Sequence, residues 1–111
     1  MSHPAYLIIG KVTCLATDDL TGNDQLVGVM GNDRFMIGEF NAGDSRDVGI
    51  NRNVPVGVTE LVVLETDAID PDDELARIDL LTDMDVARTV GIVGDSARYD
   101  IELTVTGQSD G

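Results

Sequence analysis

The stretch that decides the fold runs from residue 60 to residue 76 and reads Glu60-Leu61-Val62-Val63-Leu64-Glu65-Thr66-Asp67-Ala68-Ile69-Asp70-Pro71-Asp72-Asp73-Glu74-Leu75-Ala76. Its first seven residues are rich in valine and leucine, which is typical of a β-strand. The residues that follow are mostly acidic and include a proline, which favours a loop. A second β segment begins at about Ala76. The stretch therefore predicts two strands joined by an acidic loop.

Alternation of apolar and polar residues with a period of two continues over most of the chain and favours strands. Turns rich in Gly, Asn and Asp separate the segments, including a tight hairpin turn at 31–33. Strands are expected at 6–15, 25–30, 34–40, 47–56, 60–66, 76–81 and 98–106. Residues 82–89 are expected to form one helical turn or a loop, and 87–93 is ambiguous. In the first strand, plain alternation assigns one face to Leu7, Ile9, Lys11, Thr13 and Leu15, and the other to Ile8, Val12 and Cys14.

Seven or eight strands without sustained helical periodicity predict an all-β protein, specifically an antiparallel two-sheet β-sandwich. A length of 111 residues fits a single domain, 1–111, with a frayed tail at about 107–111. Aromatic residues make up 4% and Trp is absent, so the core has to be built mainly from aliphatic residues and Met. The single cysteine, Cys14, is expected to be a buried structural thiol, and Tyr99 a core residue.

The net charge is −14, from 21 acidic and seven basic residues, of which only Lys11 is a lysine. A surface this negative repels phosphate backbones, so nucleic acid is excluded as a partner. The same acid excess fits either a high-salt protein or a cation-binding surface. The N-terminal segment has no basic start and no apolar run long enough for a signal peptide or a membrane span, so a cytoplasmic location is the default expectation.

The sequence contains few residues of the types that catalytic sites use. His3 is the only histidine and lies at an end expected to be flexible, so histidine triads and zinc sites are excluded. No glycine-rich phosphate loop follows a strand. Two carboxylates could act as acid and base as in glycosidases, but sugar sites usually need aromatic platforms, and the four aromatic residues are scattered. The sequence therefore predicts a protein that is not an enzyme.

Two acidic clusters carry the same internal spacing. In the first, residues 17–24, Asp18 and Asp24 are six positions apart; in the second, Asp67 and Asp73 are also six apart, with Glu65 two residues before Asp67. If both loops meet at one end of the sandwich, their carboxylates converge, which only a hard cation such as Ca2+ makes favourable. The expected ligands are Asp18, Asp24, Glu65, Asp67 and Asp73. Possible backbone or accessory donors are Asp19, Thr66 and Asp72.

These two segments, 16–29 and 62–76, resemble the first and third calcium loops of the C2 domain, a calcium-binding β-sandwich. The resemblance places the first-loop ligands at Asp18 and Asp24, and the third-loop ligands at Glu65, Asp67 and Asp73. It implies a C2-like fold and a Ca2+ cofactor. Glu65 stands where the family usually has Asp, Gln25 replaces a proline, and Ala76 a glycine. The basic patch of membrane-binding members is missing.

Other interpretations remain open at this level. Aspartate-rich loops are common because Asp favours turns, so the clusters could bind nothing. The rival to a calcium-binding module is an acidic structural or assembly subunit, an oligomer or lattice without specific metal binding. Calcium could also bridge to a protein partner or a second copy. Leu20 and Ile69 near the loop tips could enter a membrane, but without a cationic ring membrane docking is not expected.

Overall fold

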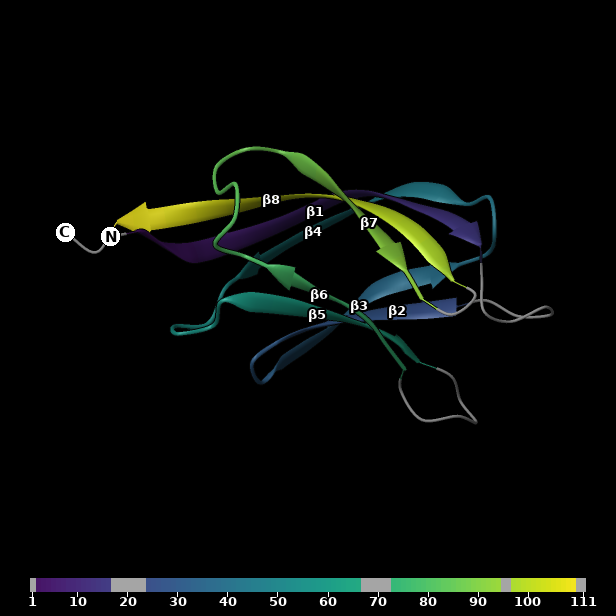
Figure 1. The fold of residues 1–111 in the computed structure, drawn as a ribbon, viewed down its shortest axis with the longest axis horizontal. Coiled ribbons are helices and arrows are strands. Elements are labelled where there is room, and N and C mark those ends of the chain that lie inside the picture. The colour runs from purple at the N-terminus through teal and green to yellow at the C-terminus, as the bar shows by residue number, and fades with distance from the viewer. Residues whose placement is uncertain (1, 17–23, 67–72, 95–96, 110–111) are drawn as a thin grey trace.

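The computed structural model describes residues 2–16, 24–66, 73–94 and 97–109, and these form eight strands (Figure 1). The first four strands are β1 Ser2–Ala16, β2 Asp24–Met30, β3 Asp33–Phe40 and β4 Ser45–Asn53. The other four are β5 Glu60–Thr66, β6 Asp73–Asp79, β7 Arg88–Val93 and β8 Arg98–Ser109. No described residue is helical. In the described part of the chain, no helix has the length and hydropathy to cross a membrane.

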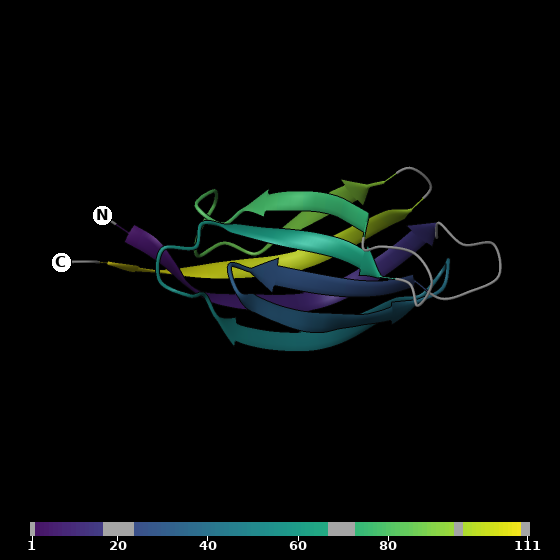
Figure 2. The ribbon, with the colours of Figure 1, turned by 90° about the horizontal axis from the view of Figure 1, so that it is seen from below.

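The strands form two antiparallel four-stranded sheets that pack face to face (Figure 2). One sheet, here called the terminal sheet, has the order β4-β1-β8-β7 and contains both ends of the described chain. The other, here called the middle sheet, has the order β3-β2-β5-β6. An all-β, two-sheet antiparallel sandwich is the architecture that the sequence predicts, and the prediction is confirmed.

The predicted and observed strand boundaries agree best where the sequence contains a clear turn signal. Residues 60–66 form a strand as predicted, and the turn after Met30 is a two-residue link, since Met30 pairs with Asp33. Gly31 adopts a φ of 63° there, a conformation that glycine reaches without steric cost. The segment 87–93, which the sequence left ambiguous, contains strand β7. The preceding residues 80–87 form a loop, in which Asp83 and Asp85 have positive φ angles.

The expectation of loose ends is wrong for the described residues. Ser2, His3 and Pro4 of β1 pair with Ser109, Gln108 and Gly107 of β8, so 107–109 continue the last strand. The cause is the length of β1, whose first residues supply pairing groups that the local sequence does not reveal. His3 therefore lies in a strand rather than in a flexible end.

The faces assigned to the first strand are also corrected. Leu7, Ile9, Val12 and Cys14 are all fully buried, although alternation alone puts the last two opposite the first two. The register of β1 shifts between Ile9 and Val12 against β8. Such a bulge inserts one residue and turns the following side chains to the other face. The core thereby gains Val12 and Cys14, and Cys14 is a buried thiol as predicted.

The core between the sheets is aliphatic with a small aromatic component. Tyr99 of β8 is 1% exposed and meets Phe40 of β3 edge-on, with ring centroids 6.0 Å apart at 76°. This contact joins the two sheets, and such a pair adds about 0.5–1.5 kcal/mol beyond its buried area. The prediction that Tyr99 lies in the core is confirmed.

Candidate functional site

The strand ends that flank both acidic segments lie at one end of the sandwich. The last residue of β1, the first of β2, the last of β5 and the first of β6 gather on the right of Figure 1, away from the paired ends of β1 and β8, and Figure 2 agrees. This end is called the acidic pole here. It follows from antiparallel pairing of β2 with β5 and of β5 with β6, because each strand starts where its neighbour ends.

Register fixes which residues are neighbours at the acidic pole. Glu65 of β5 lies between Leu26 of β2 and Asp73 of β6, which are its pairing partners on either side. Thr66 pairs with Gln25, the residue directly after Asp24. Asp24, Glu65 and Asp73 are thus carried by three adjacent strands at the same end of one sheet.

Asp18, Asp19, Asp67 and Asp72 lie outside the described residues, and so do the side chains of Asp24 and Asp73. Their predicted role as calcium ligands remains a prediction. Within the described part of the chain, no group of three or more Asp, Glu, His or Cys side chains is clustered as a metal site.

Glu65 is the expected ligand whose side chain is described. Alternation along β5 puts it on the same face as the buried Leu61 and Val63, which is the face turned to the opposite sheet. The residue is half-buried, and its Oε2 atom is shielded from solvent. Burial disfavours an ionised carboxylate unless a cation or hydrogen bonds compensate. Glu65 thus places a carboxylate at the acidic pole, on the face turned to the opposite sheet.

Gln25 explains one departure from the C2 pattern. Its amide nitrogen donates to Glu39 Oε1 of β3 at 2.9 Å, and its amide oxygen accepts a hydrogen bond from Thr66 Oγ1 of β5 at 3.3 Å. A proline could make neither bond. The side chain thus ties three strands together at the acidic pole, and the Thr66 hydroxyl is engaged there, which leaves its carbonyl as the possible donor.

Asp44 is an acidic residue near the end of β1 that the sequence did not single out as a candidate. It lies in the turn between β3 and β4, whose backbone is hydrogen-bonded to Cys14. Its Oδ2 accepts a hydrogen bond from the Asn41 amide at 2.7 Å, which closes the turn. The role of Asp44 shown by these contacts is therefore to stabilise the turn.

The donor chemistry of the two segments suits a hard cation. Residues 17–24 contain three carboxylates and residues 65–73 contain five, so these segments hold eight of the 21 acidic residues and none of the seven basic ones. Carboxylate, hydroxyl and carbonyl oxygens are the ligands of Ca2+, whereas zinc and copper favour His or Cys.

Comparison of the sequence finds no matching protein family and no matching curated protein. Comparison of the fold finds matching solved structures. The structure of the two tandem C2 domains of extended synaptotagmin 2 matches with a TM-score of 0.56 and 17% identity, over 95% of this chain and 42% of that one. The chain has a C2-like fold. It therefore spans less than half of that two-domain structure.

Two structures of human GIVD cytosolic phospholipase A2 also match the C2-like fold. Both are complexes with methyl gamma-linolenyl fluorophosphonate, and one also contains terbium chloride. Their TM-scores are 0.53 and 0.51, at 12% identity, over 99% of this chain and 19% and 18% of the phospholipase chains. At these identities the likeness concerns the fold, and it confirms the C2-like architecture that the two acidic segments suggested.

Proposed function

We propose that this C2-like domain is a non-enzymatic calcium-binding module. Asp18 and Asp24 from the first segment and Glu65, Asp67 and Asp73 from the second would hold one or two Ca2+ ions at the acidic pole. The ion supplies positive charge that joins the two loops, and it orders them or bridges them to a partner.

The observation that supports the proposal most is the register of the middle sheet. It brings the ends of β2, β5 and β6 together, with Glu65 beside Asp73 and its Oε2 shielded from solvent. Two like charges about 4 Å apart repel by about 1 kcal/mol in water and about 4 kcal/mol near a protein surface. Carboxylates that converge at this pole, as proposed, would be costly without a cation, which favours a cation-binding role.

Calorimetric titration of the chelator-treated protein with CaCl2 tests the proposal. Wild-type protein should release or absorb heat with saturation, and Asp67→Asn or Asp24→Asn should weaken binding at least about tenfold, or about 1.4 kcal/mol. Asp83→Asn is the matched control, because it removes the same charge from the exposed loop after β6, and Asn tolerates the positive φ of 52° found there.

Two results would contradict calcium binding: no saturable heat at millimolar Ca2+, or equal weakening by Asp67→Asn and Asp83→Asn. The first result would favour the rival, an acidic assembly subunit whose loops bind no specific metal. Pelleting with anionic liposomes in Ca2+ and in chelator tests membrane docking separately, and no calcium-dependent pelleting is expected.

A further inference from the structure

Each sheet of the sandwich has two edge strands, whose outer backbone groups do not pair within the sheet. The edges are β4 and β7 in the terminal sheet and β3 and β6 in the middle sheet. Figure 2 shows β6 and β7 on the opposite side of the molecule from β3 and β4. An open edge can pair with another strand, and natural proteins commonly prevent this with bulges or charged side chains. Whether an edge accepts a partner therefore depends on whether it carries such a feature.

β3, β4 and β6 each contain a β-bulge. In β3 the pairing partner changes from Gly38 to Met36 while β2 advances by one residue. In β6 it changes from Ala76 to Glu74 while β5 advances by one. In β4 the register against β1 shifts around Gly49, which has a φ of 57°. A bulge bends the strand and interrupts its ladder, so these three edges are poor templates for an added strand.

β7 is the edge strand that remains regular. Its pairing with β8 continues from Arg88 to Val93 without a shift. The strand contains no proline, and Arg88 is its one charged residue, whereas β3, β4 and β6 each contain at least three. The Arg88 side chain is engaged across the sandwich, where it donates to the Asp79 carbonyl of β6 at 2.7 Å. The five residues that follow it form an uncharged edge that an extended chain can join.

Gly91, in the middle of this edge, leaves an acidic side chain of the next strand within reach. Thr89, Gly91 and Val93 are the exposed residues of β7, and Gly91 pairs with Asp100 of β8. A Cβ atom at Gly91 would have Asp100 Oδ1 as its nearest neighbour, at 3.7 Å. Because glycine has no side chain, the space between the edge and this carboxylate is free for a long side chain from an added strand.

Glu102 provides an internal comparison. It lies two residues after Asp100 and therefore on the same face of β8. Its Oε1 atom lies 3.4 Å from the Cβ position of Gly10 on β1, which is the neighbour of β8 on the side away from β7. On the β7 side, Glu102 pairs with Thr89, which has a side chain. Of these two carboxylates, Asp100 is thus the one that a strand added to β7 can reach.

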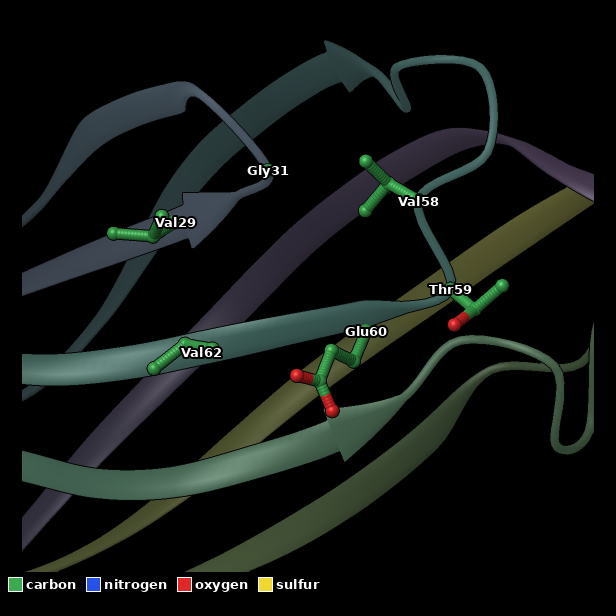
Figure 3. Close-up of a pocket in the computed structure, with 6 residues that line it drawn as sticks. All are labelled: Val29, Gly31, Val58, Thr59, Glu60 and Val62. Carbon is green, nitrogen blue, oxygen red and sulfur yellow. The ribbon is translucent and has the colours of Figure 1, made fainter.

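The hollow on the middle sheet is a different kind of surface. It has a volume of about 300 Å³ and lies between the end of β2 and the start of β5, with Val29 and Val62 in its walls (Figure 3). Both strands are paired on both sides, so their backbone cannot bind an added strand. Glu60, the charged residue in its wall, is already bonded to Arg77 at 2.6 Å. The β7 edge combines an open backbone with a nearby carboxylate, and the hollow does not.

We propose that β7 binds an extended segment of a partner protein, which adds to the terminal sheet as a fifth strand and places a Lys or Arg side chain opposite Gly91. The backbone of the segment pairs with β7, and its basic group binds Asp100 across the glycine. Main-chain hydrogen bonds supply affinity in such strand addition, and side-chain contacts supply specificity. The net charge of −14 also favours encounter with a basic partner.

A second copy of the chain lacks the basic group that this site requires. In an antiparallel pair, directly opposite side chains lie on the same face of the sheet. β7 of a second copy would therefore place Thr89, Gly91 or Val93 opposite Gly91, and none of these is basic. The Asp100 carboxylates of both copies would gain no cation, and two chains of charge −14 repel each other. The proposed occupant is therefore a basic segment of another protein.

NMR titration of the isotope-labelled protein with a synthetic peptide tests the proposal. The peptide is acetyl-Thr-Thr-Val-Lys-Val-Thr-Thr-amide, in which Lys and the outer residues are placed for strand addition. We expect saturable amide shift changes concentrated in residues 88–93. Asp100→Asn should weaken binding about three- to fivefold, as for a partly exposed ion pair. Gly91→Thr, which fills the space in front of the carboxylate, should weaken it at least as much. Glu102→Gln is the matched control and should bind like the wild type.

Two control peptides separate backbone pairing from charge. Norleucine in place of Lys removes the charge, and this peptide should bind the wild type as weakly as the Lys peptide binds Asp100→Asn. Proline in place of both Val residues keeps the charge but removes two backbone donors, so it should abolish the shifts in residues 88–93. Thermal melts establish that each protein variant is folded.

Four results would overturn the proposal. They are no saturable shifts at millimolar peptide, shifts that avoid residues 88–93, equal weakening by Asp100→Asn and Glu102→Gln, and undiminished binding of the proline peptide. Shifts in residues 88–93 that depend on protein concentration without peptide would overturn it in favour of a second copy. All samples contain chelator, so the outcome is independent of calcium binding.

Discussion

Gly28 in β2 shows how closely the core is fitted around one residue. A Cβ atom at this position would lie 2.5–3.0 Å from three atoms of the Phe35 ring on the neighbouring strand. No residue with a Cβ atom fits there without displacing the ring, and the guanidinium carbon of Arg52 lies 4.7 Å from the centre of the same ring. The glycine is therefore required by a close approach and not by its backbone conformation.

Gly28→Ala should lower the free energy of unfolding by about 1–3 kcal/mol, because it overpacks a filled core. Urea denaturation followed by circular dichroism measures the change. Gly91→Ala is the control, since a Cβ there meets its nearest neighbour, Asp100 Oδ1, at an ordinary 3.7 Å. Equal stability of Gly28→Ala and the wild type would show that the Phe35 ring is not where the structure has it.

Asp33 and Arg52 connect the two sheets at one edge. Arg52 of β4 donates to both carboxylate oxygens of Asp33 of β3, at 2.9 and 2.6 Å. These hydrogen bonds hold the pKa of Asp33 below its ordinary value of 3.8. A carboxyl whose pKa is lower in the folded state stabilises the fold above its ordinary pKa, and the contribution disappears as pH falls through the folded pKa.

The melting temperature of Asp33→Asn should therefore lie below that of the wild type at neutral pH. The difference should shrink from about pH 4 downward as Asp33 of the wild type is protonated. Thermal melts between neutral pH and about pH 2.5 measure it. A difference that stays constant over this range would mean that the ion pair does not contribute.

At the scale of elements, the paired ends of β1 and β8 are a cooperative part of the sheet. Residues 107–109 pair with residues 2–4, which lie at the opposite end of the chain. A local reading of Gly107 to Gly111 indicates a frayed tail, because glycine and short polar residues disfavour regular structure. Pairing with the long first strand overrides that preference.

Truncation after Thr106 should lower the free energy of unfolding by about 1–2 kcal/mol, because it removes the backbone hydrogen bonds of three residue pairs. It should also abolish amide-exchange protection in the first residues of β1. Truncation after Ser109 is the control and should leave both quantities unchanged. If the two truncations behave alike, the terminal pairing is absent in solution.

The acidic pole is likewise a product of element pairing. Residues 60–66 and the hairpin turn at Gly31 were predictable, because each depends on local composition. The start of β6 at Asp73 was not, since the first two residues there, Asp73 and Glu74, are both acidic and do not resemble a strand. They are strand residues because β5 offers them a ladder to pair with.

At the scale of the whole molecule, the net negative charge makes the stability of the fold depend on salt and on bound cations. The net charge is −14, and eight carboxylates belong to the two segments 17–24 and 65–73. Self-repulsion destabilises the compact state, and salt screens it. A ligand that binds only the folded state adds about 2.7 kcal/mol at a hundredfold excess over its dissociation constant.

The melting temperature in chelator should therefore rise with NaCl, and Ca2+ should raise it further. The calcium increment should persist at about 0.5 M NaCl, because ligation by converging oxygens is not merely screening. MgCl2 at the same ionic strength is the control, since Mg2+ needs a stricter octahedral geometry. Identical responses to Ca2+, Mg2+ and NaCl would indicate screening alone.

The sequence by itself determined the all-β class, most strand positions, the turns and the spacing of the two acidic segments. These follow from local properties, namely alternation, turn chemistry and charge. Only the tertiary structure decided that Val12 and Cys14 join Leu7 and Ile9 in the core, and that Glu65 lies beside Asp73 at one pole. A bulge and a register are set by pairing between distant strands, and a single residue of shift turns every later side chain to the other face.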